Sequence, residues 1–380
     1  MNGAERISIL QVGKFYPPHM GGIETHLQVL CTELKKSVDL RVIVANDGRR
    51  QIDSFVDGVS VCRLATLLFL NSTPICRRMV REIRDTPADL IHIHLPNPVA
   101  LICYLLGGQN KPLILTWHSD IVRQKTLAKA LIPLEISALK RCSACVVTSE
   151  NYRDSSPLLD RYRDLCRVVP YGIQLDQFKT ADDNKVASIR QQYGDRLILS
   201  VGRFVYYKGF EYLIRAMQHV TGKLLLVGDG PLRKDMEKEA RELGLMDRIF
   251  FLGEIQNEQL APYFHAADIF VLPSVARSEA FGIVQLEAMA SGTPVVNTQI
   301  ESGVPFVSRD GETGFTVAPR DRLALAAAIN RLLNDRALRK KYGEAAVQRV
   351  NQLFTAEKMA GGMLDLYRQT LSENGHQAHL

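Results

Sequence analysis

The chain has 380 residues, of which 46% are hydrophobic and 23% are charged. These values exclude a disordered or fibrous protein, and the length predicts two globular domains of roughly 150 to 200 residues each. The formal net charge of +6 is modest, and no nucleic-acid-binding motif accompanies the basic residues, so we expect no nucleic-acid partner.

Short apolar runs alternate with helical patterns in the first half of the chain. Leu27, Leu30 and Leu34, for example, recur at the spacing of one helix face. Strands that alternate with helices predict a parallel sheet that is covered by helices on both faces. The runs that we expect to form strands are residues 7–12, 40–44, 90–94, 113–116 and 144–148.

Basic residues are concentrated in two segments of this first half. The first segment contains Arg77, Arg78, Arg81 and Arg84, and the second contains Arg123, Lys125, Lys129, Lys140 and Arg141. A solvated helix face explains such segments about as well as attraction to anionic lipid headgroups or to a phosphorylated acceptor does. Both interpretations stay open.

The pattern of strands and helices is interrupted near residue 170. The turn sequence Pro170-Tyr171-Gly172 is followed by a polar segment, residues 180–184. We therefore place a first domain at residues 1–172 and a second at 173–355, and we expect a last helix at 356–380 to pack back on the first domain.

The pattern of the first domain starts again in the second. The expected strands are residues 197–201, 224–227, 249–252, 269–272 and 294–296. The expected helices are residues 211–218, 233–243, 259–265, 324–333 and 336–371. A second sheet of the same α/β class follows, and two such domains that face each other would leave a cleft at the carboxyl edges of both sheets, where ligands bind.

The cysteines and the apolar stretches indicate the cellular compartment of the protein. All seven cysteines lie between Cys31 and Cys166, and no secretory signal precedes them, so we expect no disulfide framework. The longest nearly uncharged apolar stretch, residues 99–108, is too short for a membrane span of about 20 residues. We expect a cytoplasmic protein that contacts the inner face of the plasma membrane peripherally, if at all.

The most informative segment is residues 274–294, which follows a pattern of loop, helix and strand. Gly282 is expected to open the helix and Ser291-Gly292 to close it, so that backbone N–H groups at the helix start favour a phosphate. Glu279 and Glu287 would then be separated by on the order of 12 Å, close to the length of a sugar diphosphate. Their carboxylates can accept hydrogen bonds from sugar hydroxyls, although the spacing alone favours helix-terminal, solvent-facing glutamates.

Two further strand ends carry residues suited to a phosphate ligand. Arg203 and Lys208 follow the expected strand 197–201, where their charges could neutralise a diphosphate leaving group. Gly228 follows the next strand, where a glycine permits close approach of a ligand. A surface salt bridge or a tight turn explains each of these features individually.

Taken together, these motifs resemble the retaining glycosyltransferases of family 4, which have the GT-B fold of two Rossmann-like domains with parallel sheets that face each other across a cleft. The resemblance covers nearly the whole chain. It rests on Gly21-Gly22, Gly202-Arg203, Lys208-Gly209, Gly228-Asp229-Gly230 and Glu279-x7-Glu287.

The resemblance implies a role for each motif in the donor domain, residues 173–355. Glu279 would contact the donor sugar and Glu287 the ribose, while Arg203 and Lys208 would hold the diphosphate. Phe281, Gly282 and Ile283 would present their backbone to the sugar and phosphate. Tyr207 stands where the family often has an acidic residue, which leaves the charge of Lys208 unchanged but affects its local orientation.

The resemblance also implies roles in the acceptor domain, residues 1–172. Gly22 would belong to a loop that closes over the donor, and His118 would lie near the reacting sugar, where a histidine can donate to a hydroxyl or carry a proton. Asp120 and His94 are candidates on the acceptor side, although Asp120 could equally cap a helix. The family needs no metal and no cofactor. His92 and His94 alternate on a strand, so a two-histidine metal site is conceivable, but further ligands with suitable spacing are not evident and satisfied core or cleft histidines are the favoured interpretation.

The implied reaction is transfer of a hexose from a nucleoside diphosphate sugar to a hydroxyl, with retention of anomeric configuration. Residues 117–125 and 302–305 are similar to bacterial mannosyltransferases that build O-antigen chains, which favours GDP-mannose as donor and a saccharide or polyprenyl-diphosphate-linked acceptor. The alternatives are a UDP-hexose-dependent enzyme, a nucleotide-sugar epimerase and a noncatalytic binding module. A dinucleotide-dependent oxidoreductase is disfavoured, because the first strand is not followed by Gly-x-Gly-x-x-Gly.

Overall fold

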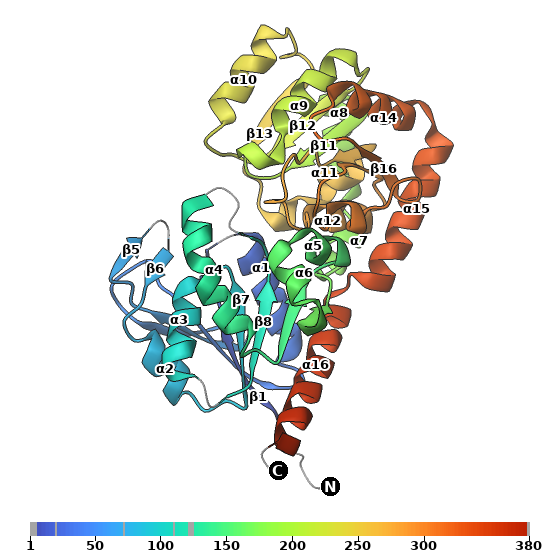
Figure 1. The fold of residues 1–380 in the computed structure, drawn as a ribbon. Coiled ribbons are helices and arrows are strands. Elements are labelled where there is room, and N and C mark those ends of the chain that lie inside the picture. The colour runs from blue at the N-terminus through green and yellow to red at the C-terminus, as the bar shows by residue number, and fades with distance from the viewer. Residues whose placement is uncertain (1–5, 20, 71–72, 109–110, 121–124, 378–380) are drawn as a thin grey trace. The chain divides into compact units, whose positions relative to one another are not determined.

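The computed structural model describes residues 6–19, 21–70, 73–108, 111–120 and 125–377 (Figure 1). The chain divides into two compact units. The first unit contains Met1–Gly172 and Ala356–Leu380, and the second contains Ile173–Thr355. Part of the second basic segment, including Arg123, lies outside the described residues, as do residues 121–124 of the segment similar to mannosyltransferases.

The first unit is built on a sheet that has eight strands among the described residues, in the order β10-β9-β8-β7-β1-β2-β4-β3. All neighbours pair in parallel except β3 and β4. The strands are β1 (Ser8–Val12), β2 (Asp39–Ala45), β3 (Ile52–Val56), β4 (Val59–Leu64), β7 (Leu90–Leu95), β8 (Leu113–Trp117), β9 (Ala144–Val147) and β10 (Cys166–Val168). The strand order reverses between β1 and β7, which is the position where open α/β sheets bind ligands.

Helices cover this sheet and bury its apolar side chains. They are α1 (Gly22–Leu34), α2 (Met79–Asp85), α3 (Pro98–Gly107), α4 (Lys125–Leu139), α5 (Glu150–Ser155), α6 (Pro157–Arg161) and α16 (Ala356–Gln377), together with the 3₁₀ turn η1 (Arg163–Leu165). Asn97 caps α3 through its side chain, and Ser149 caps α5 in the same way. The last helix, α16, belongs to the first unit, where Met359, Met363 and Tyr367 pack with residues of α1 and the sheet (Figure 1).

The second unit contains a sheet with six strands in the part of the chain that the structure describes, in the order β13-β12-β11-β14-β15-β16, and all of them are parallel. The strands are β11 (Leu197–Val201), β12 (Lys223–Val227), β13 (Ile249–Gly253), β14 (Ile269–Val271), β15 (Val295–Thr298) and β16 (Gly314–Val317). The order reverses between β11 and β14, again at a position suited to ligand binding.

Helices on both sides of the second sheet complete this unit. They are α7 (Asp176–Lys179), α8 (Asp183–Tyr193), α9 (Phe210–Ala216), α10 (Arg233–Glu242), α11 (Ala261–Ala266), α12 (Val284–Ala290), α13 (Val304–Val307), α14 (Arg322–Asn334) and α15 (Arg336–Leu353). The 3₁₀ turns are η2 (Tyr206–Lys208), η3 (Met217–His219) and η4 (Asn257–Gln259). A buried cluster that includes Phe204, Phe210 and Ile329 forms the core between strands and helices.

The structure differs from the predicted elements in several places. The hairpin of β3 and β4, the short pair β5 (Leu68–Leu70) and β6 (Thr73–Ile75), and the strand β16 were not predicted. Asp57 and Gly58 both have positive φ in the β3–β4 turn, so the Asp-Gly sequence was a signal that could have revealed this hairpin. The predicted helix 336–371 is two helices, since α15 ends at Leu353 and α16 begins at Ala356.

Two expectations about cysteines and membranes can be compared with the structure. All seven cysteines are buried and free. None of the described helices combines the length and the apolar character that a membrane span requires.

Candidate active site

An ion pair joins the two strands at which the order of the second sheet reverses. Lys208 follows β11 and Glu279 follows β14, and the Nζ of Lys208 lies 2.6 Å from Oε2 of Glu279. Only 11% of the Lys208 side chain and 10% of the Glu279 side chain are exposed. The pair is therefore largely shielded from water. In such an environment a charge interaction is much stronger than on the surface.

Glycine allows the two loops of this ion pair to meet. Gly209 has a φ of 66°, and a Cβ atom at this position would lie 2.3 Å from the carbonyl oxygen of Pro273. The backbone of one loop therefore touches the backbone of the other, and the N–H of Val275 donates to the carbonyl oxygen of Tyr207 over 2.8 Å. This contact fixes the loop from which Lys208 reaches Glu279.

The surroundings of the pair favour the charged form of Lys208. Ser274 donates a hydrogen bond from Oγ to Oε2 of Glu279 over 3.2 Å. Burial has the largest single effect and lowers the pKa of Lys208, but the charge and hydrogen bond of Glu279, together with Tyr207 and Glu287, outweigh it, so that the pKa is raised above its ordinary value. Tyr207, which stands where an acidic residue is common in the family, has a pKa raised by burial and by Glu279.

Glu287 is the second carboxylate near Lys208. It lies on α12, where burial raises its pKa to about 7 against the opposing effect of the Lys208 charge. At neutral pH this carboxyl is therefore divided between its protonated and ionised forms. It can donate a hydrogen bond as well as accept one.

The expected spacing of about 12 Å along one helix between Glu279 and Glu287 is wrong. Helix α12 begins at Val284, so Glu279 lies in the loop before it and the helical rise does not apply. Gly282 has a φ of 75°, in the left-handed region, which explains why the helix cannot start there. The two carboxylates are therefore not spaced along one helix to match a sugar diphosphate. Both interact electrostatically with the same lysine, Lys208.

The end of α12 is as predicted, and the residues before it are divided between core and surface. Ser291 caps the helix, and Gly292 follows with a φ of 74°. The Phe281 side chain is buried and contacts the rings of Phe306 and Phe354, so only its backbone is available to a ligand. Ile283 is half-buried.

The remaining predicted donor residues lie at strand ends of the second sheet. Arg203 is exposed, and among the described residues no carboxylate forms an ion pair with it. Gly228 has a φ of 128°, and a Cβ atom there would lie 2.1 Å from the carbonyl oxygen of Gly202, so it joins the ends of β12 and β11 tightly. Asp229, the residue after Gly228, forms an ion pair with Arg233 over 2.9 Å.

In the first unit, His118 and His94 belong to a buried chain of hydrogen bonds. His94 Nδ1 lies 2.9 Å from His118 Nε2, and His94 Nε2 lies 2.9 Å from Oε1 of Gln11. The other nitrogen of His118, Nδ1, is hydrogen-bonded to the hydroxyl of Tyr171. Both ring nitrogens of His118 are thus engaged, and contact with a sugar hydroxyl requires the exchange of one of these bonds.

The same chain continues to the last helix of the protein. Gln11 donates from Nε2 to the hydroxyl of Tyr367 over 2.9 Å, and this hydroxyl lies 2.7 Å from Nδ1 of His92. His92 Nε2 lies 2.6 Å from the hydroxyl of Thr116. His92 and His94 are therefore satisfied histidines of the core, one of the two interpretations that the sequence allowed.

The direction of these hydrogen bonds follows from Gln11. Its Oε1 can only accept, so His94 carries its proton on Nε2 and accepts on Nδ1 from the Nε2–H of His118. Burial lowers the pKa of His92 to about 3, and burial with the neighbouring histidines lowers those of His94 and His118 well below the ordinary value. Each ring is therefore neutral and has one donor and one acceptor.

Gly22 and Asp120 are the remaining predicted residues of the first unit. Gly22 is the first residue of α1, and a Cβ atom there would meet nothing within 4 Å among the described residues. Asp120 accepts from Nε1 of Trp117 over 2.8 Å and from the hydroxyl of Ser156 over 3.4 Å. The alternative that Asp120 caps a helix depends on residues 121–124, which lie outside the described residues.

One residue near His118 was missed by the sequence analysis. His26 on α1 is 5% exposed, and its ring centroid lies 4.9 Å from that of His118 and 4.3 Å from that of Tyr171. It lies on the helix that Leu27 and Leu30 predicted, but no local motif links it to His118. Only the tertiary fold brings them together.

Comparison with known proteins identifies the family. Residues 20–177 match the family model Glycosyltransferase Family 4, and residues 182–349 match Glycosyl transferases group 1. The chain is 31% identical to O-antigen chain mannosyltransferase C of Escherichia coli, over 96% of this chain and 98% of that protein. It is 32% identical to the D-rhamnosyltransferase WbpZ of Pseudomonas aeruginosa, over 91% of this chain and 93% of that protein.

Two further relatives extend the comparison. The chain is 29% identical to a GDP-mannose-dependent alpha-(1-6)-phosphatidylinositol monomannoside mannosyltransferase of Mycolicibacterium smegmatis, over 86% of this chain and 89% of that protein. The solved structure of sucrose-phosphate synthase from Thermosynechococcus elongatus superposes with a TM-score of 0.78 at 26% identity, over 96% of this chain and 100% of that chain. From these matches and from its two parallel-sheet units, the chain belongs to glycosyltransferase family 4, has the GT-B fold and is an enzyme that transfers hexosyl groups.

Proposed function

We propose that this enzyme transfers mannose from GDP-mannose to a hydroxyl of a saccharide or lipid-linked acceptor in the synthesis of cell-surface O-antigen polysaccharide, with retention of the anomeric configuration. The observation that supports it best is the buried Lys208, which faces Glu279 and lies within the electrostatic influence of Glu287 where the strand order reverses. A cation beside two carboxylates suits a ligand that has a diphosphate flanked by hydroxyl-rich sugars.

The charges support this assignment of the donor groups. Lys208 is neutralised by Glu279, whereas Arg203 is exposed and has no carboxylate partner among the described residues. In our proposal a diphosphate binds between these two cations, and Glu279 accepts hydrogen bonds from the transferred sugar. Glu287, with a pKa of about 7, would bind the ribose hydroxyls as acceptor or donor.

The state of Glu279 argues against a covalent glycosyl-enzyme intermediate as the route to the proposed retention. Its Oε2 already receives a hydrogen bond from Ser274 and the charge of Lys208, which weakens this oxygen as a nucleophile. We therefore propose that Glu279 orients the sugar without bonding to its anomeric carbon. The departing diphosphate takes the proton of the acceptor hydroxyl on the same face of the sugar, while Arg203 and Lys208 stabilise the charge that develops on it.

GDP-mannose is favoured by the relatives. One is named a mannosyltransferase of O-antigen chains, and another is named GDP-mannose-dependent. A UDP-hexose donor is the second candidate. A nucleotide-sugar epimerase, which needs no acceptor, is a weaker alternative because the full-length relatives are transferases. No metal or other cofactor is part of the proposed transfer step.

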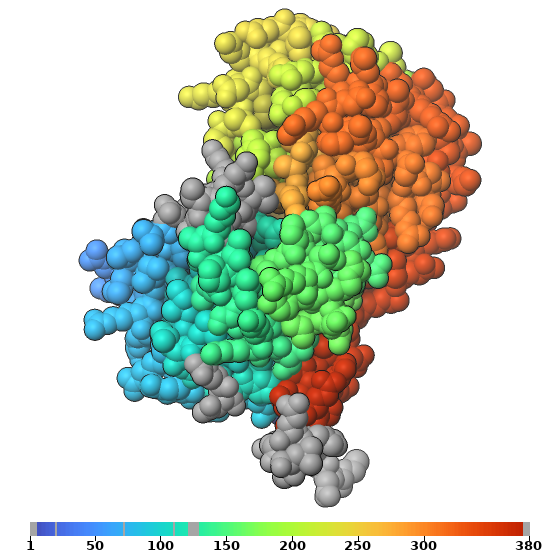
Figure 2. All heavy atoms as spheres, in the orientation of Figure 1, coloured from blue at the N-terminus to red at the C-terminus, as the bar shows by residue number. Residues whose placement is uncertain are grey.

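A lipid-linked acceptor and peripheral contact with an anionic membrane are supported by the surface of the first unit. The exposed apolar side chains of this unit include those of β5, the residue before it and α3, and α3 contacts β6 and the helix α2, which carries exposed arginines. The part of the chain that contains these elements is blue to teal in Figure 2. The apolar residues are Leu67, Leu68, Phe69, Leu70, Ile102 and Leu106. Apolar side chains beside cationic ones are suited to a lipid surface.

The donor assignment can be tested with the purified full chain. Calorimetry with GDP and UDP should show tighter binding of GDP, and incubation with a panel of nucleotide sugars should release nucleotide fastest from GDP-mannose. The anomeric configuration of the product, measured by NMR, should equal that of the donor. Tighter binding of UDP would overturn the choice of nucleotide, and an inverted product would overturn the mechanism.

A further inference from the structure

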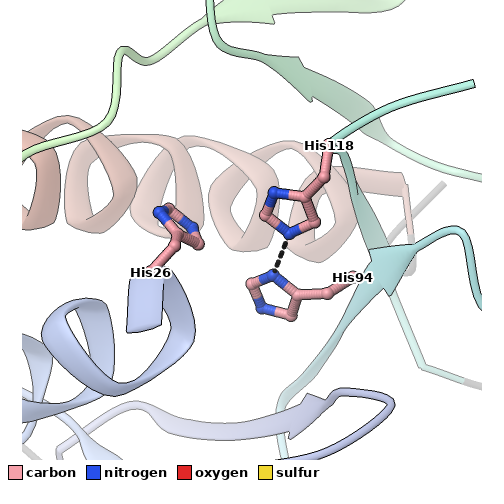
Figure 3. Close-up of side chains that lie close together, drawn as sticks. All are labelled: His26, His94 and His118. Carbon is pink, nitrogen blue, oxygen red and sulfur yellow. Dashed lines mark hydrogen bonds between the residues drawn. The ribbon is translucent and has the colours of Figure 1, made fainter. Parts of the chain in front are cut away.

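Three buried histidines of the first unit come together from three different elements (Figure 3). His26 lies on α1, His94 on β7, and His118 directly after β8. One ligand nitrogen from each of the three rings lies within 4.8 Å of the other two. Their exposures are 5%, 1% and 2%, so the group is enclosed by protein.

His26 is the unexplained member of this group. In the described part of the chain, neither of its ring nitrogens has a hydrogen-bond partner, although both are buried. An unpaired buried polar atom costs about 1–3 kcal/mol, and such an atom in a native protein often marks the place of an ion or a water. The His26 ring lies beside the two histidines that already face each other, with its centroid 4.9 Å from that of His118 and 5.8 Å from that of His94.

The other two rings are held from behind, as the ligands of metal sites are. His94 donates its Nε2–H to Oε1 of Gln11 over 2.9 Å, which leaves Nδ1 directed at the group. The Nδ1 of His118 is held by the hydroxyl of Tyr171, which leaves Nε2 directed at the group. Protein oxygens that fix the remote nitrogen of each imidazole are typical of metal-binding histidines.

We propose that His26, His94 and His118 form a binding site for a divalent transition-metal ion of the Zn²⁺ class. Three neutral imidazoles without a carboxylate favour Zn²⁺, Co²⁺, Ni²⁺ or Cu²⁺ over Mg²⁺ and Ca²⁺, which prefer oxygen ligands. Tetrahedral Zn²⁺ with Zn–N bonds of about 2.0–2.1 Å requires nitrogens about 3.3 Å apart. His94 Nδ1 and His118 Nε2 are already 2.9 Å apart, so modest ring movements suffice.

The protons balance when the ion binds. The proton that His118 now carries on Nε2 must move to the other nitrogen of its ring, because both Nε2 of His118 and Nδ1 of His94 become ligands. His118 adopts the other tautomer, with its proton on Nδ1, which then donates to the hydroxyl oxygen of Tyr171. His94 keeps its Nε2–H on Gln11. The imidazoles are neutral before and after, so ligation itself releases no proton, and a water completes the fourth position.

Occupation of the site has a consequence for catalysis. An ion bound to His118 Nε2 fixes this ring away from any substrate, so the loaded enzyme should be inhibited. This consequence rests on the proposed role of His118 in the transfer reaction, whereas metal binding itself does not. The two are separated by measuring binding and turnover independently.

The test uses the full chain, freed of metal with a chelator and titrated with Co²⁺ and Zn²⁺. We expect one Co²⁺ per chain with the intense visible absorption of tetrahedral coordination, displacement of Co²⁺ by Zn²⁺, and a higher melting temperature with Zn²⁺. In His26→Leu the affinity for Zn²⁺ should fall at least tenfold. This variant should fold, since His26 gives up no hydrogen bond found among the described residues.

The matched control is His219→Leu, which removes an exposed histidine of the second unit and should leave the affinity unchanged. Equal Zn²⁺ binding by His26→Leu and the unmodified protein would overturn the site, as would a weak octahedral Co²⁺ spectrum or the absence of binding at micromolar Zn²⁺. If Zn²⁺ binds as expected but turnover is unaffected, the site stands and the role of His118 in transfer is contradicted.

Discussion

The Nζ of Lys208 lies 2.6 Å from Oε2 of Glu279, and both side chains are about nine-tenths buried. Because of this ion pair, Lys208 contributes to the stability of the fold as well as to the proposed reaction. A substitution that removes one member leaves the other charged and shielded from water, which is far more costly than the loss of a surface pair.

Removal of Lys208 should therefore destabilise the second unit as well as slow the reaction. We expect Lys208→Ala to lower the free energy of unfolding by about 3 kcal/mol, because, among the described side chains, Glu279 then keeps the hydrogen bond from Ser274 alone. The double variant Lys208→Ala, Glu279→Ala should lose less than the sum of the two single variants. Urea unfolding of all four proteins measures this coupling, and strictly additive losses would contradict it.

Arg203 separates the chemical effect of a cation from the structural one. It is exposed and has no carboxylate partner in the described chain, so Arg203→Ala should leave the melting temperature nearly unchanged. If it stabilises the leaving diphosphate, kcat should fall by roughly 10²-fold or more. Arg241→Ala, which removes an exposed arginine of α10, serves as control and should keep normal turnover. Normal turnover of Arg203→Ala would remove this residue from the mechanism.

Glu287 should make stability depend on pH. Its pKa is about 7 in the folded protein, above the ordinary value of 4.5, so the folded state binds this proton more tightly than the unfolded state does. The stabilisation that comes from this tighter proton binding is fully present below pH 4.5 and is lost as the pH rises toward 7. The free energy of unfolding then falls by on the order of 3 kcal/mol. Glu287→Gln should lack this loss. Unfolding curves at pH 5 and 8 test this, and an equal pH dependence of both proteins would contradict the raised pKa.

The sequence was sufficient for the repeating strand and helix pattern but not for the conformation before α12. Apolar runs predicted the central strands because a buried parallel strand is apolar on both faces. Gly282 was taken as the start of a helix, yet its φ of 75° interrupts the helical conformation. A glycine is compatible with both outcomes, and only the packing of its neighbours, with Leu272 and Gln285 both close to where its Cβ would be, distinguishes them.

The histidine cluster shows the same limit for the candidate site. The alternation of His92 and His94 predicted that they share one face of a strand, and they do, with ring centroids 4.3 Å apart. His26 carried no signal, because its neighbours in space are distant in sequence. Tyr367 joins the same cluster from the last helix, 275 residues away from His92, and no local pattern could connect them.

Tyr367 should contribute to stability through its hydroxyl. The hydroxyl accepts from Nε2 of Gln11 and donates to Nδ1 of His92, so Tyr367→Phe leaves two buried polar atoms without this partner. We expect a loss of roughly 1–3 kcal/mol in the free energy of unfolding. Tyr206→Phe, at an exposed hydroxyl near Ser278, should cost less than about 0.5 kcal/mol. Equal losses in denaturant unfolding would show that the buried chain carries no special stability.

Gly209 should not tolerate a side chain because the backbone of another loop lies too close. Gly244, which has a similar φ but no such neighbour among the described residues, serves as the comparison. Gly209 and Gly244 have nearly equal φ values, 66° and 67°, but a Cβ atom at Gly209 would lie 2.3 Å from the carbonyl oxygen of Pro273, whereas one at Gly244 would meet nothing within 4 Å among the described residues. Gly244→Ala should therefore cost only the conformational term of about 1 kcal/mol.

Gly209→Ala should cost clearly more, because two loop backbones must separate, and it should also slow transfer because Lys208 moves with its loop away from Glu279. Melting temperatures and kcat of the two variants test this directly. If Gly209→Ala loses stability but keeps full turnover, the position of Lys208 relative to Glu279 is not what the reaction depends on. If both variants lose equally little stability, the close contact between the two loops is not maintained in solution.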